Sequence, residues 1–193
     1  KLLTICIILT SMFLQGCSQQ ESVRFKHLYK QNGLWTKKFS TVPFSGKTTG
    51  LVQTTIKDGK MIGEYLSFFN NGKLNVKCFY DKDGEYHGEY LSYSYTDGSL
   101  YIKSFYKNGK KIGLHETYHR SGVVWIIENY NNNGEKHGYE KWFCSNGQLQ
   151  KEILYSNDKI VEDFDIYNCD GKYEKTRKLQ NGLCCVDYIK RNK

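Results

Sequence analysis

Short runs of alternating apolar and polar residues fill most of this chain, and nearly every run ends at a glycine that follows Asn, Asp or Ser. Pairs such as Asn71-Gly72 and Asn108-Gly109 accept positive φ, so they close tight turns between strands. These turn positions form two interleaved series. The first is Gly33, Gly59, Gly84, Gly109, Gly134, Asp158 and Gly182, and the second is Gly46, Gly72, Gly98, Gly122, Gly147 and Gly171.

Consecutive first-series positions are 24–26 residues apart, and each second-series glycine follows 13 or 14 residues later. This spacing leaves room for one strand of roughly 7–9 residues between turns. It predicts an all-β fold: an elongated single-sheet array of tandem β-hairpin repeats, each about 25 residues long. Four units carry a third glycine, at Gly63, Gly88, Gly113 and Gly138. Glycine inside a strand predicts a bulge or a close approach of two backbones.

Aromatic side chains occupy equivalent positions in successive units. Phe68, Tyr93, Tyr118, Phe143 and Tyr167 stand nine residues after a first-series turn, and Tyr80, Tyr106, Tyr130 and Tyr155 stand eight residues after a second-series glycine. The position two residues after that glycine holds Leu74, Leu100, Val124 or Leu149. Offsets of two and eight have the same parity, which predicts one shared face of a strand. We expect a ladder on that face, and the nine aromatics are the candidate structural and contact residues.

The stretch "HETYH" (115–119) matches the H-E-x-x-H zinc signature, which requires a helix to bring both histidines to one ion. Here the motif falls in the first strand of a hairpin, where residues four apart are about 13 Å from each other. His115 takes the position held by Tyr65 and Tyr90 in sister units. We therefore predict no catalytic residue, no metal site and no cofactor, and hence a protein that is not an enzyme.

Composition supports the β prediction, since the 193 residues include 16 Tyr, 10 Phe and 18 Gly but a single Pro. The formal net charge of +8 is uneven. Residues 172–193 carry a net +5 and form a basic C-terminal cap. Such a short basic tail serves solubility or an anionic surface rather than nucleic-acid recognition, so no nucleic-acid partner is expected.

The N-terminal segment differs from the rest. Lys1 precedes an uncharged, mostly apolar run that is too short to span a bilayer and is typical of a secretory signal peptide. Its end, "LQGC" (14–17), resembles the lipobox of bacterial lipoproteins, which implies cleavage before Cys17 and a lipid on its thiol. We therefore expect a lipoprotein signal peptide at 1–16, a tether at 17–32 and a repeat domain at 33–193. Localisation would be the bacterial cell envelope, with the exported protein anchored by that lipid.

Five further cysteines follow Cys17, and an odd number cannot all pair. They are Cys78, Cys144, Cys169, Cys184 and Cys185. Export permits disulfides, but the spacing does not predict which cysteines pair. The chain has no C-x-x-C pair, so a structural zinc site is not expected. The spacing is compatible with either redox state, and we interpret most of these cysteines as small buried apolar residues.

The segments "DGKMIGEYLSFFNNGKL", "DGEYHGEYLSYSYTDGSL", "NGKKIGLHETYHRSGVV" and "NGEKHGYEKWFCSNGQL" together resemble the bacterial MORN-repeat variant family. The resemblance covers about Gly33 to Gly182. It implies a β-hairpin array that binds or scaffolds, without catalytic residues. Some members are labelled antitoxins of toxin–antitoxin systems, a cytoplasmic role that fits poorly with an export signal.

The sequence favours a non-catalytic, membrane-anchored binding or scaffold module with a protein or glycan partner. One alternative is a binder of cell-wall polymer or glycan, although Trp35, Trp125 and Trp142 hold non-equivalent positions and form no repeated cage. A second alternative is an antitoxin-like protein that binds a partner. A third, a zinc hydrolase using His115 and His119, requires the helix that the hairpin pattern excludes.

Lipidation at Cys17 is directly testable. In cells fed labelled palmitate, the full chain is expected to take up label and to fractionate with membranes. Cys17→Ala removes the thiol that would carry the lipid, so label should be lost and the protein should move to the soluble fraction. Equal labelling of the two proteins would contradict the lipobox assignment.

Overall fold

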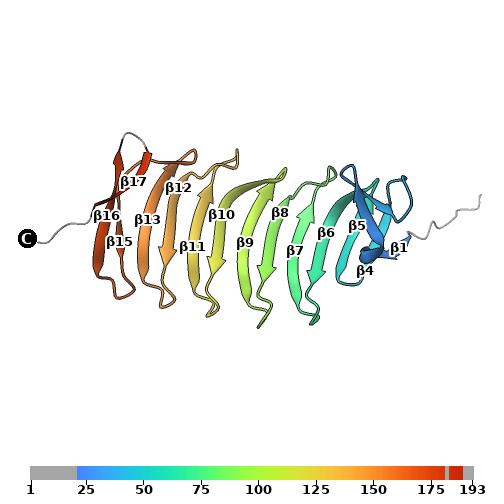
Figure 1. Ribbon diagram of the computed structural model, residues 1–193, viewed down its shortest axis with the longest axis horizontal. Coiled ribbons are helices and arrows are strands. Elements are labelled where there is room, and N and C mark those ends of the chain that lie inside the picture. Colours follow the sequence, from blue (N-terminus) through green and yellow to red (C-terminus); the bar gives the residue numbers. More distant parts are fainter. Residues whose placement is uncertain (1–20, 181–182, 189–193) are drawn as a thin grey trace, which may run out of the picture.

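The computed structural model describes residues 21–180 and 183–188, and it is almost entirely β-structure (Figure 1). A short 3-10 helix, η1, spans Phe25–His27. The strands are β1 (Ser22–Arg24), β2 (Leu28–Gln31), β3 (Leu34–Lys37), β4 (Gly46–Thr49), β5 (Val52–Lys57), β6 (Lys60–Phe68), β7 (Leu74–Tyr80), β8 (Gly88–Tyr93), β9 (Leu100–Lys107), β10 (Lys110–Tyr118), β11 (Val124–Tyr130), β12 (Gly138–Phe143), β13 (Leu149–Ser156), β14 (Lys159–Ile160), β15 (Phe164–Tyr167), β16 (Tyr173–Gln180) and β17 (Leu183–Tyr188).

One long sheet confirms the predicted hairpin array. From β4 to β13 each strand lies beside the next strand in sequence, and β15, β16 and β17 extend the order, with β14 paired to the side of β13. Figure 1 shows the resulting ribbon running from the N-terminal strands to β17. The "HETYH" motif lies on β10 and the turn after it, not on a helix. Within the described residues no helix has the length and apolar character needed to cross a membrane.

The N-terminal region differs from the predicted tether at 17–32. Its described part is folded: β1 pairs in parallel with β4, and β2 pairs with β3 in a separate two-stranded sheet. The cause is apolar burial, because Leu28, Phe44 and Ile56 form a core against which Trp35 and Met61 pack. Residues 22–31, which the predicted tether included, therefore belong to the folded part of the chain. The predicted signal peptide and Cys17 lie outside the described residues.

The turns have two geometries, which do not follow the two series strictly. At Asp58-Gly59 and Asn108-Gly109 both residues have positive φ, between 49° and 77°, and close two-residue hairpins as predicted. The second-series turns are longer, and so are the first-series turns at Gly84 and Gly134. In the turn between β6 and β7, Asn71 Oδ1 accepts a hydrogen bond from the Lys73 amide at 3.1 Å. Asparagine thus serves the second series through its side chain, as in an Asx-turn, rather than through positive φ.

The third glycine of each unit marks a bulge, as expected. Gly113 has φ +63°, and the pairing of β10 with β9 shifts register between Ile112 and Glu116. On its other side Gly113 pairs with Tyr130, just as Gly63 pairs with Tyr80. A residue with a Cβ would be strained at this φ, so glycine permits the bulge that bends the strand.

The two aromatic series lie on opposite faces, and the expectation that the positions two and eight residues after a second-series glycine share one face is wrong. The Tyr118 hydroxyl donates to Glu116, two residues earlier on the same face, whereas His115 points to the other side. Tyr118 pairs with Val124 after a register shift in β11. Because of this shift, Val124 and Tyr130 lie on opposite faces although they are an even number of residues apart. We call the face of Tyr65, Cys78, Ser104 and His115 the inner face, and the opposite face the outer face.

A row of inner-face side chains is buried, although among the described residues no second layer of structure covers most of the sheet. Cys78, Ser104, His115, Glu140 and Ile153 are between 0% and 7% exposed. The strands are bowed along their length (Figure 1). A single bent layer can bury a central row when longer side chains flank it on both sides, and the tyrosines next to the bulges provide that flank.

Contacts between successive turns fasten the sheet edge formed by the second-series turns. Asn71 Nδ2 donates to the Tyr95 carbonyl at 3.1 Å, and Asn146 Nδ2 donates to the Cys169 carbonyl at 2.8 Å. A disulfide joins Cys144 to Cys169, 25 residues later. That separation is one repeat, so the bond links neighbouring turns. Cys78 is buried with a free thiol.

Removing the disulfide should destabilise the C-terminal part of the array. A 25-residue loop is released in the unfolded chain, so Cys144→Ser with Cys169→Ser is expected to lower the free energy of unfolding by roughly 2–4 kcal/mol. Urea unfolding measures the change. Reducing agent should lower the wild-type midpoint and leave the double variant unaffected. A wild-type midpoint insensitive to reductant would contradict the structural role of the bond.

Candidate functional site

The aromatics predicted from the repeat register are all half-buried. Tyr80, Tyr106, Tyr130 and Tyr155 flank the buried row of the inner face, while Phe68, Tyr93, Tyr118, Phe143 and Tyr167 line the sheet near the second-series turns. Each of these residues pairs with one on an adjacent strand: the set near the second-series turns with the strand that follows, and the set that flanks the buried row with a glycine of the strand before. Part of each ring is therefore used to hold the array together. The structure therefore brings the predicted aromatic residues together as two rows on opposite faces of the sheet rather than as one surface.

Around Cys78 the inner face is a cluster of tyrosines. The Tyr80 ring stacks on Tyr86 with centroids 4.8 Å apart, and Tyr86 lies 5.2 Å from Tyr106. Tyr65 and Tyr90 pack edge-on against this stack. Burial raises the pKa of the Cys78 thiol to about 12, so at neutral pH it is an unreactive packing group.

Farther along the inner face the same positions carry charge. His115 Nδ1 is hydrogen-bonded to the Ser104 hydroxyl, and His115 Nε2 lies 3.5 Å from Glu128. Lys136 Nζ bridges Glu128 and Glu140, at 2.5 Å from each carboxylate. Trp142 Nε1 donates to Glu140. The result is one connected network in which every buried charge has a partner.

The network shifts the pKa values of its members. Burial lowers the pKa of His115 below 6.5, with Lys111 acting in the same direction, so the imidazole is neutral at pH 7. Burial of Glu128 opposes ionisation, but its ion pair with Lys136 outweighs this and lowers the pKa of the carboxyl. The pair therefore stays charged while the histidine beside it does not.

Ser104, His115 and Glu128 have the composition of a catalytic triad, a grouping that sequence reasoning did not find. Ser104 has 0% exposure, so no substrate carbonyl can reach its hydroxyl, and Glu128 is engaged by Lys136. The second histidine of the "HETYH" motif is used elsewhere, because His119 Nε2 lies 2.9 Å from the Phe143 carbonyl oxygen. These contacts assign the histidines structural roles.

The outer face carries a repeated three-part arrangement that the sequence analysis missed. Phe79, Phe105 and Tyr139 are 39–41% exposed, in three different units. A lysine ammonium lies 5.7–6.0 Å from each ring centroid and pairs with a carboxylate at 2.7–4.0 Å. The ion pairs are Lys77–Glu64, Lys103–Glu89 and Lys141–Glu152. We call this set, with the exposed Leu114, the outer-face row.

The sequence contains a signal for this row, one position before the tyrosines predicted as contact residues. Phe79 and Phe105 immediately precede Tyr80 and Tyr106. Alternation places such neighbours on opposite faces, but only the fold shows which face is left exposed.

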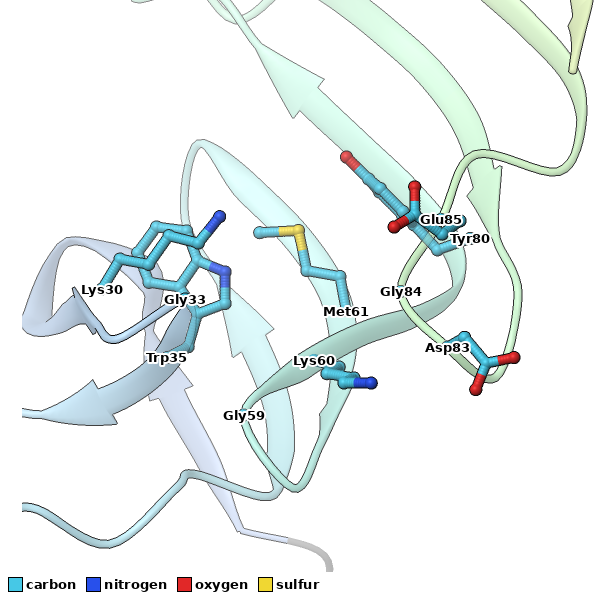
Figure 2. Close-up of a pocket in the computed structure, with 10 residues that line it drawn as sticks. All are labelled: Lys30, Gly33, Trp35, Gly59, Lys60, Met61, Tyr80, Asp83, Gly84 and Glu85. Atoms are coloured by element: carbon cyan, nitrogen blue, oxygen red, sulfur yellow. The ribbon is translucent and has the colours of Figure 1, made fainter. Parts of the chain in front are cut away.

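A cleft of about 430 Å³ opens between the N-terminal β2–β3 hairpin and the turn after β7. Figure 2 shows Lys30 and Trp35 on one side, Tyr80 and Glu85 on the other, and Met61 between them. Lys60, Asp83 and three glycines complete the lining. The cleft lies where the two-stranded sheet ends and the open inner face begins, so it depends on the folding of residues that the sequence assigned to a tether.

Comparison with known proteins identifies the repeat. Residues 61–82, 111–132 and 136–157 match the MORN repeat variant. The three segments cover most of hairpins β6–β7 and β10–β11 and of the β12–β13 pair. No curated protein matches the chain. The chain therefore contains MORN repeat variants, which are generally binding or scaffold modules and typically non-catalytic.

Acid should destabilise the protein through His115. Its folded pKa is below 6.5, so as pH falls from about 6.5 the unfolded chain takes up the proton first and stability is lost. We expect the unfolding temperature to fall between pH 7 and pH 5. Each kcal/mol lost from the free energy of unfolding should lower it by roughly 2–4 °C. Glu128, also depressed, contributes only below about 4.5.

His115→Tyr, which installs the residue found at 65 and 90, should flatten this pH dependence, while His87→Tyr at an exposed position should not. Thermal unfolding followed by circular dichroism at each pH makes the comparison. An unchanged slope in the His115 variant would show that other groups carry the effect.

Proposed function

We propose that this protein is a non-catalytic, lipid-anchored module of the bacterial cell envelope that binds or scaffolds a partner protein. The outer-face row carries the proposal. Phe79 and Phe105 recur at equivalent places in two units, and Tyr139 adds a third exposed ring from the first strand of another hairpin. Exposed apolar surface rimmed by charged pairs marks interaction sites in soluble proteins. Aromatic residues are also enriched at the cores of protein interfaces.

The repeat explains why such a surface suits a scaffold. Rings on β7, β9 and β12 are held by one continuous sheet, so their spacing is fixed by strand separations of about 4.8 Å. Each ring also has its lysine and carboxylate placed by the same ladder. A partner would therefore meet a rigid, extended and periodic surface, which lowers the entropy cost of binding.

Two observations support the proposed location. The Cys144–Cys169 disulfide is the kind of bond that persists in oxidising compartments outside the cytoplasm. The lipobox-like "LQGC" ends four residues before Glu21, the first described residue. Four residues span at most about 14 Å, so a lipid on Cys17 would keep the N-terminal strands close to the bilayer.

The function is tested by removing two rings. Protein from envelope extracts should be captured by the immobilised wild-type chain and lost with Phe79→Ser plus Phe105→Ser, with a rise in Kd of roughly tenfold or more. Phe39→Ser is the matched control, because Phe39 is 94% exposed but lies outside the row. Equal capture by the double variant and the control, or no specific capture by wild type, would overturn the proposal.

A further inference from the structure

We propose that the cleft between the β2–β3 hairpin and the turn after β7 binds one pyranose ring of a glycan. This inference rests on the proposed role as an envelope binding module and gives it a second, separate site. The cleft volume of about 430 Å³ is sufficient for a monosaccharide unit, and the opening to the inner face leaves room for the rest of a chain.

The walls of the cleft match the two kinds of surface that a sugar presents. Trp35 and Tyr80 lie on opposite sides with Met61 between them (Figure 2). Flat aromatic faces pack against the C–H faces of a pyranose, and their polar edges tolerate the hydroxyls around its rim. A purely aliphatic ligand would leave the charged rim without partners.

The polar groups at the rim are available for a ligand. Among the described residues, the side chains of Lys30, Lys60 and Glu85 make no hydrogen bond or ion pair, whereas Asp83 is paired with Lys82 at 2.7 Å. Two ammonium groups and one carboxylate provide donors and acceptors together. Hydroxyl groups act as both, so a polyhydroxylated ring can satisfy all three.

The charge around the cleft is small. The charged side chains of the lining, Lys30, Lys60, Asp83 and Glu85, sum to zero, and counting Lys82, the ion-pair partner of Asp83, gives a net charge of only +1. A strongly charged compound therefore gains little net attraction. A planar nucleobase could stack on the same rings but offers fewer hydroxyls to the rim. The observations therefore favour a neutral sugar over a phosphate, a quaternary ammonium or a base.

The cleft is formed without a ligand because both walls are tied to the sheet. The Trp35 amide donates to the Gly59 carbonyl at 2.9 Å, and the Trp35 ring packs on Phe25 at 4.7 Å. Gly59 has no room for a side chain, since a Cβ there would lie 2.7 Å from the Leu34 Cβ. On the other side Tyr80 is held by its stack on Tyr86.

The test uses sedimentation of the purified chain with insoluble cellulose, chitin and purified bacterial cell wall. At least one polysaccharide should retain the wild-type protein in 0.5 M NaCl. Lys30→Met with Glu85→Gln, both at exposed positions, should raise Kd about tenfold, because the first change removes the Lys30 donors and the second removes the charge that strengthens hydrogen bonds to residue 85. Trp35→Phe should weaken binding with the fold retained, checked by circular dichroism.

The outer-face variant Phe79→Ser plus Phe105→Ser is the control and should bind polysaccharide normally. Loss of protein capture with retained glycan binding would therefore separate failure of the proposed function from failure of this inference. Absence of binding to all three polysaccharides, binding abolished by salt alone, or equal binding by the Lys30 and Glu85 variant would overturn the sugar assignment.

Discussion

Everything in this molecule depends on antiparallel backbone pairing between each strand and the next in sequence. No helical layer or second sheet packs on the described array beyond its N-terminal end, so the ladder itself must hold the strands in place. The described core of fully apolar residues is confined to that end, around Leu28, Phe44 and Ile56. Elsewhere stability comes from cross-strand contacts summed over many repeats, as in other solenoid-like proteins.

The bend at each third glycine turns this ladder into a structure with an interior. Because the bulge curves the strand, a central row can be buried by the tyrosines on its flank, and short side chains such as Ser104 and Cys78 become fully enclosed. That enclosure explains the polar network. Once His115, Glu128 and Glu140 occupy row positions, each needs a partner, and Lys136 with Ser104 supplies it. A grouping that looks like catalytic chemistry is here the consequence of placing polar residues in a buried repeat position.

Burial of the inner-face row also makes the two faces of the sheet different. Side chains of the inner face mostly contact one another, through tyrosine rings in the earlier repeats and through ion pairs in the later ones. On the outer face, in contrast, Phe79, Phe105 and Tyr139 are partly exposed beside their Lys–Glu pairs. The two proposed binding surfaces, the outer-face row and the cleft at the N-terminal end, therefore lie where packing within the sheet leaves side chains accessible.

The turn glycines and their spacing alone determined the strand order, the hairpin repeat and the strand conformation of "HETYH", since these depend on local φ preferences and on period. Other features followed only from the folded sheet. The bulges reverse alternation next to Leu74 and Val124, so parity counted along the sequence placed them on the wrong face. The pairing of Cys144 with Cys169 and the folding of Ser22–Gln31 depend on contacts between residues distant in the chain. Local patterns specify where a chain turns, but which side chains are buried is decided by what the neighbouring strand brings next to them.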